Sequence, residues 1–317
     1  MKILANDGIS ASGFKLLEEN GFEVLTTKVA QEQVANYINK NEVSILLVRS
    51  ATKVNQELID SCPNLKLIGR GGVGMDTIDV DYALSKGIQV INTPKASSIS
   101  VAELVFAHLF SGVRFLAEAN RHMPLDGDTR FEELKKDFQK GVELRGKTLG
   151  IIGFGVIGQE VAKMAIGLGM QVLASSRTPK TKTIALDFYN GTSVDFTIAS
   201  TSMDKVLSES DFITLHTPFQ HEYIIGDLEF NKMKEGVGII NTSRGGAIDE
   251  VALLANFESG KVAFAGLDVF EEEPTPAIQV LMHPQMSLSP HIGGSTVEAQ
   301  DRIGEELAQQ IISIFKQ

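Results

Sequence analysis

The stretch Leu149-Gly150-Ile151-Ile152-Gly153-Phe154-Gly155-Val156-Ile157-Gly158 places a G-x-G-x-x-G pattern directly after an apolar, strand-like run. Apolar residues at helical spacing follow it, and a second strand is predicted at 171–174. In such a unit the first glycine permits a tight turn, the second lets a pyrophosphate approach the backbone, and the third lets helix and strand pack closely. The pattern predicts a dinucleotide site at the helix N-terminus, the alternative being a glycine-rich turn without a ligand. The predicted cofactor contacts are Gly153, Gly155, Val156, Ile157 and Gly158.

The residues after the second strand bear on which dinucleotide binds. NAD-binding folds usually place an acid there, on the ribose 2′-hydroxyl, but this chain reads Ser175-Ser176-Arg177-Thr178, with Lys180 and Lys182 beyond. A carboxylate would repel a 2′-phosphate, whereas hydroxyl and guanidinium groups bind one. Ser176 and Arg177 therefore favour NADP. The alternative is that Arg177 stacks on adenine and that NAD binds.

Strands and helices alternate along the rest of the chain in two series. The predicted strands are 3–5, 22–25, 43–48, 65–68 and 88–91, then 148–152, 171–174, 211–215, 238–241 and 263–268. Capping boxes at Ser100/Glu103 and Ser295/Glu298 predict two long helices that end near residues 115 and 315. The polar stretch 123–141 has no strand character. We predict an α/β fold with two Rossmann-like domains and parallel sheets, the first of them flavodoxin-like.

Composition limits the possible functions. The 317 residues carry a formal charge of -11 and no basic stripe, which argues against a nucleic-acid partner. Cys62 is the only cysteine, which excludes an internal disulfide or a thiolate metal site, and we predict no metal. The chain shows neither a signal peptide nor an apolar run near the ~18 residues of a membrane span. We expect a cytoplasmic protein without a membrane partner.

Three segments near predicted strand ends carry reactive side chains. They are Asn241-Thr242-Ser243-Arg244-Gly245-Gly246, Asp268-Val269-Phe270-Glu271-Glu272-Glu273-Pro274 and Ser289-Pro290-His291-Ile292-Gly293-Gly294-Ser295-Thr296. Each has a plain explanation when taken singly: a surface ion pair, an acidic turn or a helix cap. Together with the fingerprint, these blocks resemble the D-isomer-specific 2-hydroxyacid dehydrogenase family over the whole chain.

The resemblance implies a domain arrangement and a set of roles. A substrate domain of residues 1–96 plus 291–317 would be interrupted by an NAD(P)-binding domain of 97–290, through which a homodimer would form. His291 would exchange the hydroxyl proton, Glu273 would hold its ring, and Arg244 would bind the carboxylate and polarise the carbonyl. The implied further cofactor contacts are Thr217, Thr242, Ser243, Asp268 and Gly294, with His216 as a neighbour of the cofactor.

Arg49 and Ser50 follow a predicted buried strand, where α/β sheets bind ligands. A guanidinium and a hydroxyl suit a substrate phosphate, and the backbone of Val73 and Gly74 suits a carboxylate; the alternatives are a structural ion pair for Arg49 and a plain turn for 69–74. Within the family, 48–54 and 291–300 look most like short-form D-3-phosphoglycerate dehydrogenases, which lack an appended regulatory domain. Where those enzymes commonly show asparagine, this chain reads Lys95-Ala96-Ser97-Ser98.

Three functional hypotheses follow. The first is oxidation of 3-phospho-D-glycerate to 3-phosphooxypyruvate in serine biosynthesis. The second is a glyoxylate or hydroxypyruvate reductase, or another D-2-hydroxyacid dehydrogenase of the family, which the Ser176-Arg177 pair favours because NADPH favours reduction. The third is a non-enzymatic dinucleotide sensor, against which the complete set of Arg244, Glu273 and His291 argues.

Overall fold

The structure is a computed structural model that describes residues 1–316. The chain forms two compact units, and each is built on its own parallel sheet. Unit 1 comprises Met1–Ser100 and Gly294–Gln317, and unit 2 comprises Val101–Gly293. The predicted domain borders lie after residue 96 and before residue 291. The chain therefore leaves unit 1 at one point and returns to it at the other.

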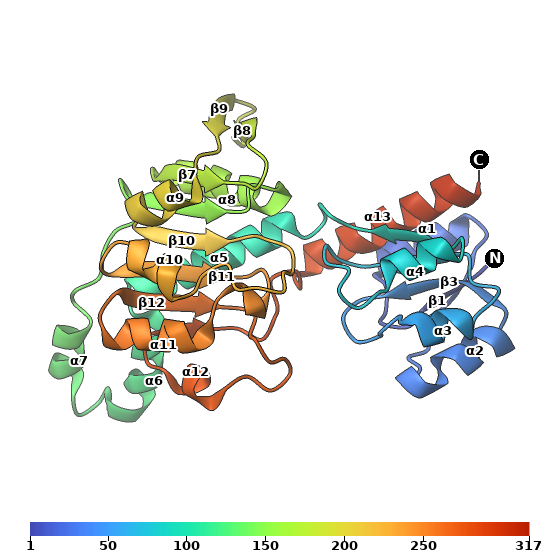
Figure 1. The fold of residues 1–317 in the computed structure, drawn as a ribbon, viewed down its shortest axis with the longest axis horizontal. Helices are drawn as coiled ribbons and strands as arrows, with labels where there is room; N and C mark the ends of the chain where they lie inside the picture. Colours follow the sequence, from blue (N-terminus) through green and yellow to red (C-terminus); the bar gives the residue numbers. More distant parts are fainter. Residues whose placement is uncertain (317) are drawn as a thin grey trace. The chain divides into compact units, whose positions relative to one another are not determined.

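Unit 1 is a five-stranded sheet in the order β2-β1-β3-β4-β5, the flavodoxin-like order predicted (Figure 1). Its strands are β1 (Lys2–Ala5), β2 (Glu23–Leu25), β3 (Val43–Val48), β4 (Leu67–Arg70) and β5 (Gln89–Asn92). Its helical segments are α1 (Ala11–Glu19), η1 (Gln31–Gln33), α2 (Val34–Lys40), α3 (Gln56–Asp60), α4 (Val80–Ser85) and α13 (Val297–Phe315). The strand order reverses between β1 and β3, so the loops after these two strands lie at a topological switch point.

The two faces of this sheet are covered by different helices because side chains alternate along each strand. In β3, Ile45 and Leu47 pack in one apolar cluster with residues of α1 and α13. Leu46 and Val48 pack in another cluster with residues of α2, α3 and α4. Burial on both faces explains the nearly continuous apolar run that predicted this strand. The single thiol, Cys62, is buried in the second cluster, and burial raises its pKa to about 11.

Unit 2 is a six-stranded parallel sheet in the order β13-β12-β11-β10-β6-β7. Its strands are β6 (Thr148–Ile152), β7 (Gln171–Ser175), β10 (Phe212–Leu215), β11 (Val237–Asn241), β12 (Val262–Leu267) and β13 (Met286–Leu288). Its helical segments are α5 (Ser98–Val113), which begins in unit 1, α6 (Leu116–Asp126), α7 (Phe131–Asp137), α8 (Val156–Gly167), α9 (Met203–Glu209), α10 (Asp227–Lys232), η2 (Gly245–Ala247), α11 (Glu250–Glu258) and α12 (Ile278–Met282). The strand order reverses between β6 and β10, which places the predicted fingerprint turn at this switch point.

Some elements were not predicted, and two predicted helix caps were wrong. The polar stretch 123–141 has no strand, as predicted, but it contains the end of α6 and all of α7. Residues between β7 and α9 form an antiparallel hairpin, β8 (Thr181–Asp187) and β9 (Ser193–Ala199), which projects from the sheet in Figure 1. Helix α5 begins at Ser98, so Ser100 lies inside the helix rather than at its cap. Helix α13 is capped by Thr296, whose side chain accepts from the Ala299 N–H, and not by Ser295.

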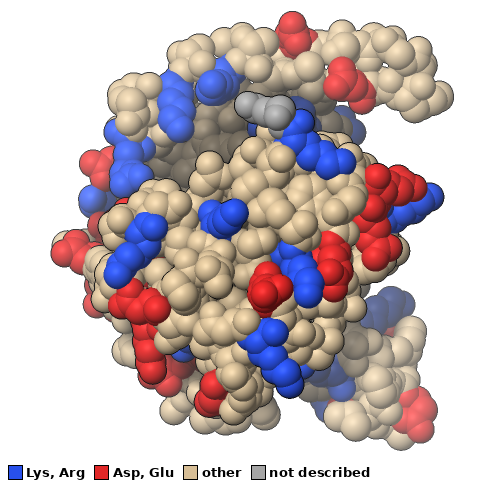
Figure 2. All heavy atoms as spheres, turned by 90° about the vertical axis from the view of Figure 1, so that its right-hand side faces the viewer, with Lys and Arg blue, Asp and Glu red and all other residues tan. Residues whose placement is uncertain are grey.

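Charged side chains of both signs are interspersed on the face of the molecule shown in Figure 2. Within residues 1–316, no single helix has the length and apolarity to cross a bilayer, although the bent pair α5 and α6 meets that test together.

Candidate active site

The turn between β6 and α8 has the shape of a phosphate-binding cradle. Gly153 has φ +101°, and a Cβ there would collide with the His216 carbonyl oxygen. A Cβ at Gly158 would collide with the carbonyl oxygen of Gly153, whereas one at Gly155 would meet nothing within 4 Å. The first and third glycines are thus needed for packing, and the second leaves open space at the start of α8. Val156 and Ile157 form the first turn of that helix, where backbone N–H groups lack intrahelical acceptors.

Polar atoms without partners lie at the neighbouring strand ends. Among the described residues, His216 Nδ1, Thr217 Oγ1 and Thr242 Oγ1 are buried and have no hydrogen-bond partner. A buried polar atom left unpaired costs about 1–3 kcal/mol, so these atoms suit a polar ligand. Burial lowers the pKa of His216 to about 3, so its ring is neutral at physiological pH. These residues and the glycine turn fit a bound dinucleotide.

Ser176 and Arg177 lie directly beyond the end of β7. The carbonyl of Ser175 accepts from the Gly153 N–H at 3.0 Å, which ties this strand end to the glycine turn. Arg177 is exposed, and Ser176 is half-buried. The two residues predicted to contact the ribose 2′-position therefore directly follow a residue that is hydrogen-bonded to the glycine turn.

His291 and Glu273 form a direct pair. Their Nδ1 and Oε2 atoms are 2.8 Å apart, and the other carboxylate oxygen, Oε1, accepts from the Phe270 N–H at 3.1 Å. A carboxylate on Nδ1 favours the tautomer that carries its proton there, which leaves Nε2 free to accept a proton. The His291 side chain is about half exposed, so this second nitrogen has access to a ligand.

The carboxylate of Asp268 holds the loop that carries His291. It is buried, and it accepts from the N–H groups of Ile292 and Gly293, both at 2.8 Å. The Asp268 carbonyl also accepts from the His291 N–H at 2.8 Å. His291 has φ +54°, an uncommon left-handed conformation for a residue with a side chain. These bonds hold the backbone of His291 in that conformation, so Asp268 anchors this loop.

Arg244 lies in the loop after β11, beside the same segment. Its carbonyl accepts from Asn241 Nδ2 at 2.8 Å, and its Nη1 donates to the Ser243 carbonyl at 2.6 Å. Asn241 Oδ1 also accepts from the backbone N–H and the hydroxyl of Ser243. A Cβ at Gly245 would collide with the Phe270 carbonyl, so the two loops touch. All three predicted catalytic residues thus belong to unit 2, and two of them are in hydrogen-bond contact.

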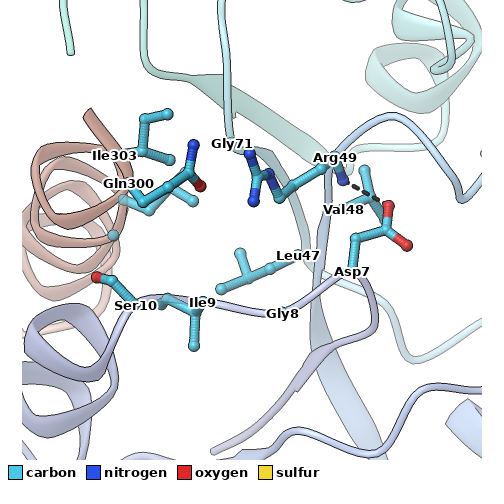
Figure 3. Close-up of a pocket in the computed structure, with 12 residues that line it drawn as sticks. Asp7, Gly8, Ile9, Ser10, Leu47, Val48, Arg49, Gly71, Gln300 and Ile303 are labelled. Carbon is cyan, nitrogen blue, oxygen red and sulfur yellow. Dashed lines mark hydrogen bonds between the residues drawn. The ribbon is translucent and has the colours of Figure 1, made fainter. Parts of the chain in front are cut away.

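Arg49 projects into a cavity of about 250 Å³ at the switch point of unit 1 (Figure 3). The carboxylate of Asp7 accepts from the Arg49 N–H at 2.6 Å and from the N–H and hydroxyl of Thr52 at 3.0 and 2.7 Å, which fixes the loop. The guanidinium points toward Gly71 and Gln300. Burial lowers the pKa of Arg49, against the opposing effect of Asp7, yet a guanidinium stays charged in proteins. Among the described residues this guanidinium forms no salt bridge, contrary to the ion-pair alternative.

The remaining predicted site residues lie in unit 1. Ser50 is exposed beside Arg49, and Val73 and Gly74 follow β4, where the Val73 carbonyl accepts from Asn92 Nδ2. The Gly294 carbonyl accepts from Gln300 Nε2 at 2.8 Å. Sequence reasoning missed the parts played by Asp7 and Gln300. The position of Asp7, directly after a strand at the switch point, was a usable signal.

Comparison with known proteins identifies the family. The model for the NAD-binding domain of D-isomer-specific 2-hydroxyacid dehydrogenases matches residues 106–293. A hydroxypyruvate reductase of Thermotoga maritima is 42% identical over 93% of this chain and 94% of its own length. A D-3-phosphoglycerate dehydrogenase of Archaeoglobus fulgidus is 39% identical over all of this chain, which spans only 58% of that relative. A solved glyoxylate reductase from Paecilomyes thermophila matches with a TM-score of 0.82 and 30% identity over 99% of this chain and 95% of its own.

The chain belongs to the D-isomer-specific 2-hydroxyacid dehydrogenase family. It is an α/β oxidoreductase of the NAD(P)-binding type.

Proposed function

We propose that this protein is a D-3-phosphoglycerate dehydrogenase, which oxidises 3-phospho-D-glycerate to 3-phosphooxypyruvate in serine biosynthesis. The observation that carries the proposal is the Arg49 guanidinium, which points into a cavity at a strand-end switch point. A phosphorylated acid needs such a cation, since an arginine fork binds phosphate oxygens in pairs. The name of the Archaeoglobus relative supports the same substrate.

His291 performs the proton transfer in this proposal. With Nδ1 bonded to Glu273, Nε2 accepts the proton of the C2 hydroxyl during oxidation and returns it during reduction. Glu273 stabilises the imidazolium that forms. Arg244 binds the substrate carboxylate and polarises the C2 oxygen. The bound dinucleotide supplies the hydride acceptor.

NADP is the preferred cofactor in this proposal. Ser176 and Arg177 follow β7 without a carboxylate on the adjacent residues, and Arg177 is exposed. A 2′-phosphate would accept from both side chains, as phosphate does from arginine and hydroxyl groups elsewhere. NAD would lose those contacts, so its KM should be higher.

Reduction of hydroxypyruvate or glyoxylate is the second candidate. It is favoured by the identity to the Thermotoga hydroxypyruvate reductase and by the segment Lys95-Ala96-Ser97-Ser98, where phosphoglycerate dehydrogenases commonly show asparagine. Steady-state assays separate the two candidates. The substrates are 3-phosphohydroxypyruvate, which is the compound called 3-phosphooxypyruvate above, hydroxypyruvate and glyoxylate, each with NADH and with NADPH. The first proposal predicts the highest kcat/KM for 3-phosphohydroxypyruvate with NADPH. Equal or better reduction of hydroxypyruvate would overturn it.

A homodimer through α5 and α6 also belongs to this proposal, as does a cytoplasmic location. Phe110, Leu116 and Leu125 are exposed on these two helices, at 42%, 55% and 77% of their surface. Exposed large apolar side chains on neighbouring helices support an interface there. Light scattering coupled to gel filtration should give twice the chain mass of 34.4 kDa. Leu116→Asp should lower that mass to one chain.

A further inference from the structure

Unit 2 contains a second histidine, His108, that the proposed reaction does not use. We propose that His108 is a positioning residue, which holds the catalytic loop in place through Ser289 and Asp268. This inference rests on the proposed function, because it takes His291 as the proton-transfer residue. It assigns to α5, a helix of the core, a part in the chemistry of a loop more than 180 residues away in sequence.

A continuous chain of hydrogen bonds links the two histidines. The ring nitrogens of His108 contact two hydroxyls, Ser287 Oγ at 2.9 Å and Ser289 Oγ at 3.0 Å. Ser289 in turn donates to Asp268 Oδ1 at 2.6 Å. Asp268 accepts from the two backbone N–H groups that follow His291. One side chain of α5 is therefore joined to the catalytic loop through two intermediates.

The directions of these bonds follow from the charge of His108. Burial lowers its pKa, against the effect of the Asp268 charge, so the ring is neutral at pH 7. A neutral imidazole has one donor and one acceptor nitrogen. Because the Ser289 hydroxyl gives its proton to Asp268, its oxygen accepts from His108 Nε2, and His108 Nδ1 accepts from Ser287. Every donor then points toward the buried carboxylate, which has no cation among the partners identified.

The fold leaves space for this histidine. His108 is 4% exposed, and it lies over Gly266 of β12. A Cβ at Gly266 would be 2.5 Å from the Cβ of His108, so a larger residue in the strand would displace the ring. The glycine and the imidazole together bring a polar side chain to the strand end that carries Asp268.

This series of hydrogen bonds matters because His291 has an uncommon left-handed backbone conformation that its surroundings must enforce. Without His108, the Ser289 oxygen loses its donor, and Ser289 is free to rotate away from Asp268. The loop would then be held to Asp268 by backbone N–H groups without Ser289, two of them on the carboxylate and that of His291 on the carbonyl. A misplacement of about 1 Å at a reacting group lowers turnover by about 100-fold.

The test compares His108→Leu with His108→Gln, whose amide keeps one donor and one acceptor. For His108→Leu we expect kcat to fall about 10- to 100-fold, with little change in KM for the 2-oxoacid or the dinucleotide. His108→Gln should restore most of the lost kcat. Val105→Ala is the matched control, because Val105 is fully buried one turn earlier on α5. It should lower the Tm and leave kcat unchanged.

Histidine NMR gives a readout that does not depend on turnover. Long-range ¹H–¹⁵N spectra of the wild type should show His108 as the Nε2–H tautomer, and Ser289→Ala should shift its Nε2 signal. If the wild type turns over D-2-hydroxyacids and His108→Leu has the same kcat, the role of His108 is wrong and the proposed function stands. A kcat that falls equally in His108→Gln, or an Nδ1–H tautomer, would also overturn the role of His108. A wild type without any such activity would instead overturn the proposed function.

Discussion

The two units share an architecture but differ in the side chains at their switch points. In unit 1 the strand order reverses between β1 and β3, and among the described residues Arg49 is the one cationic side chain that lines the cavity there, with its backbone N–H bonded to Asp7. In unit 2 it reverses between β6 and β10, and a glycine turn meets unpaired polar atoms there. Among residues 1–316, the pairing of an imidazole with a carboxylate at a strand-end loop is found in unit 2, between His291 and Glu273. The proposed function assigns a different role to each unit. Unit 2 performs the reaction, and unit 1 selects the substrate acid.

The largest effect in this comparison is expected from Glu273→Gln. An amide cannot stabilise an imidazolium, and its NH₂ group favours the wrong tautomer of His291. We expect kcat to fall about 10²- to 10⁴-fold with every substrate, as when the acid of a histidine pair is neutralised elsewhere. Glu272→Gln is the matched control, one residue earlier and exposed. Similar kcat values for the two variants would remove Glu273 from the mechanism.

A smaller and selective effect is expected from Arg49→Gln in unit 1. A hydrogen bond to a charged group contributes about 1.5–3 kcal/mol, so kcat/KM for 3-phosphohydroxypyruvate should fall about 10- to 100-fold. Hydroxypyruvate has no phosphate to lose, and its kcat/KM should change little. Lys15→Gln, on the exposed surface of α1, serves as the control. Equal losses for both substrates would mean that Arg49 supports the fold rather than the choice of acid.

The secondary structure of the two units was only partly predictable from the sequence. Strands β3 and β6 were predicted to the residue, because strands buried on both faces are nearly continuous apolar runs. The hairpin of β8 and β9 was missed although polar and apolar residues alternate along residues 193–198 of β9, a period of two that is typical of a strand. Helices α6 and α7 were missed because the first contains Pro124 and the second is short and highly charged. Local sequence carries little signal for such helices.

The contacts of the candidate site were likewise only partly predictable. Glu273 and His291 stand in motifs that could be recognised along the chain, and their contact followed from the family resemblance. The bonds from His108 to Ser289 and from Asp7 to Thr52 join residues 181 and 45 positions apart. Nothing in the sequence near either partner indicates the other. Only the packing of α5 over β12 and of the β1 loop beside β3 brings them together.

A tenfold effect on cofactor preference is expected from Arg177→Ser. The side chain is exposed, so its contact with a 2′-phosphate is partly screened by water. We expect kcat/KM for NADPH to fall about tenfold, while the value for NADH, the internal control, stays constant. An equal fall with both dinucleotides would place Arg177 against the adenine instead.

The smallest effect concerns stability at acid pH in unit 2. Burial lowers the pKa of His216 from 6.5 to about 3, so the unfolded chain binds a proton below pH 6.5 that the folded chain does not. The unfolding free energy is therefore not reduced by His216 above pH 6.5. Below pH 6.5 it falls, by at most about 1.4 kcal/mol per pH unit, because protonation of His216 stabilises the unfolded chain. Between pH 7.5 and 5.5, His216→Gln should lose about 1 kcal/mol less unfolding free energy than the wild type, measured in urea. Parallel losses in the two proteins would show that this ring is not buried as described.

The most direct test of the different roles of the two units is His291→Ala assayed with both 3-phosphohydroxypyruvate and hydroxypyruvate. Removal of the proton-transfer group from unit 2 should lower kcat for the two acids by the same factor, at least about 100-fold. The thermal shift with NADPH should remain. Turnover within a few-fold of the wild type, or a loss confined to one of the two acids, would contradict the account.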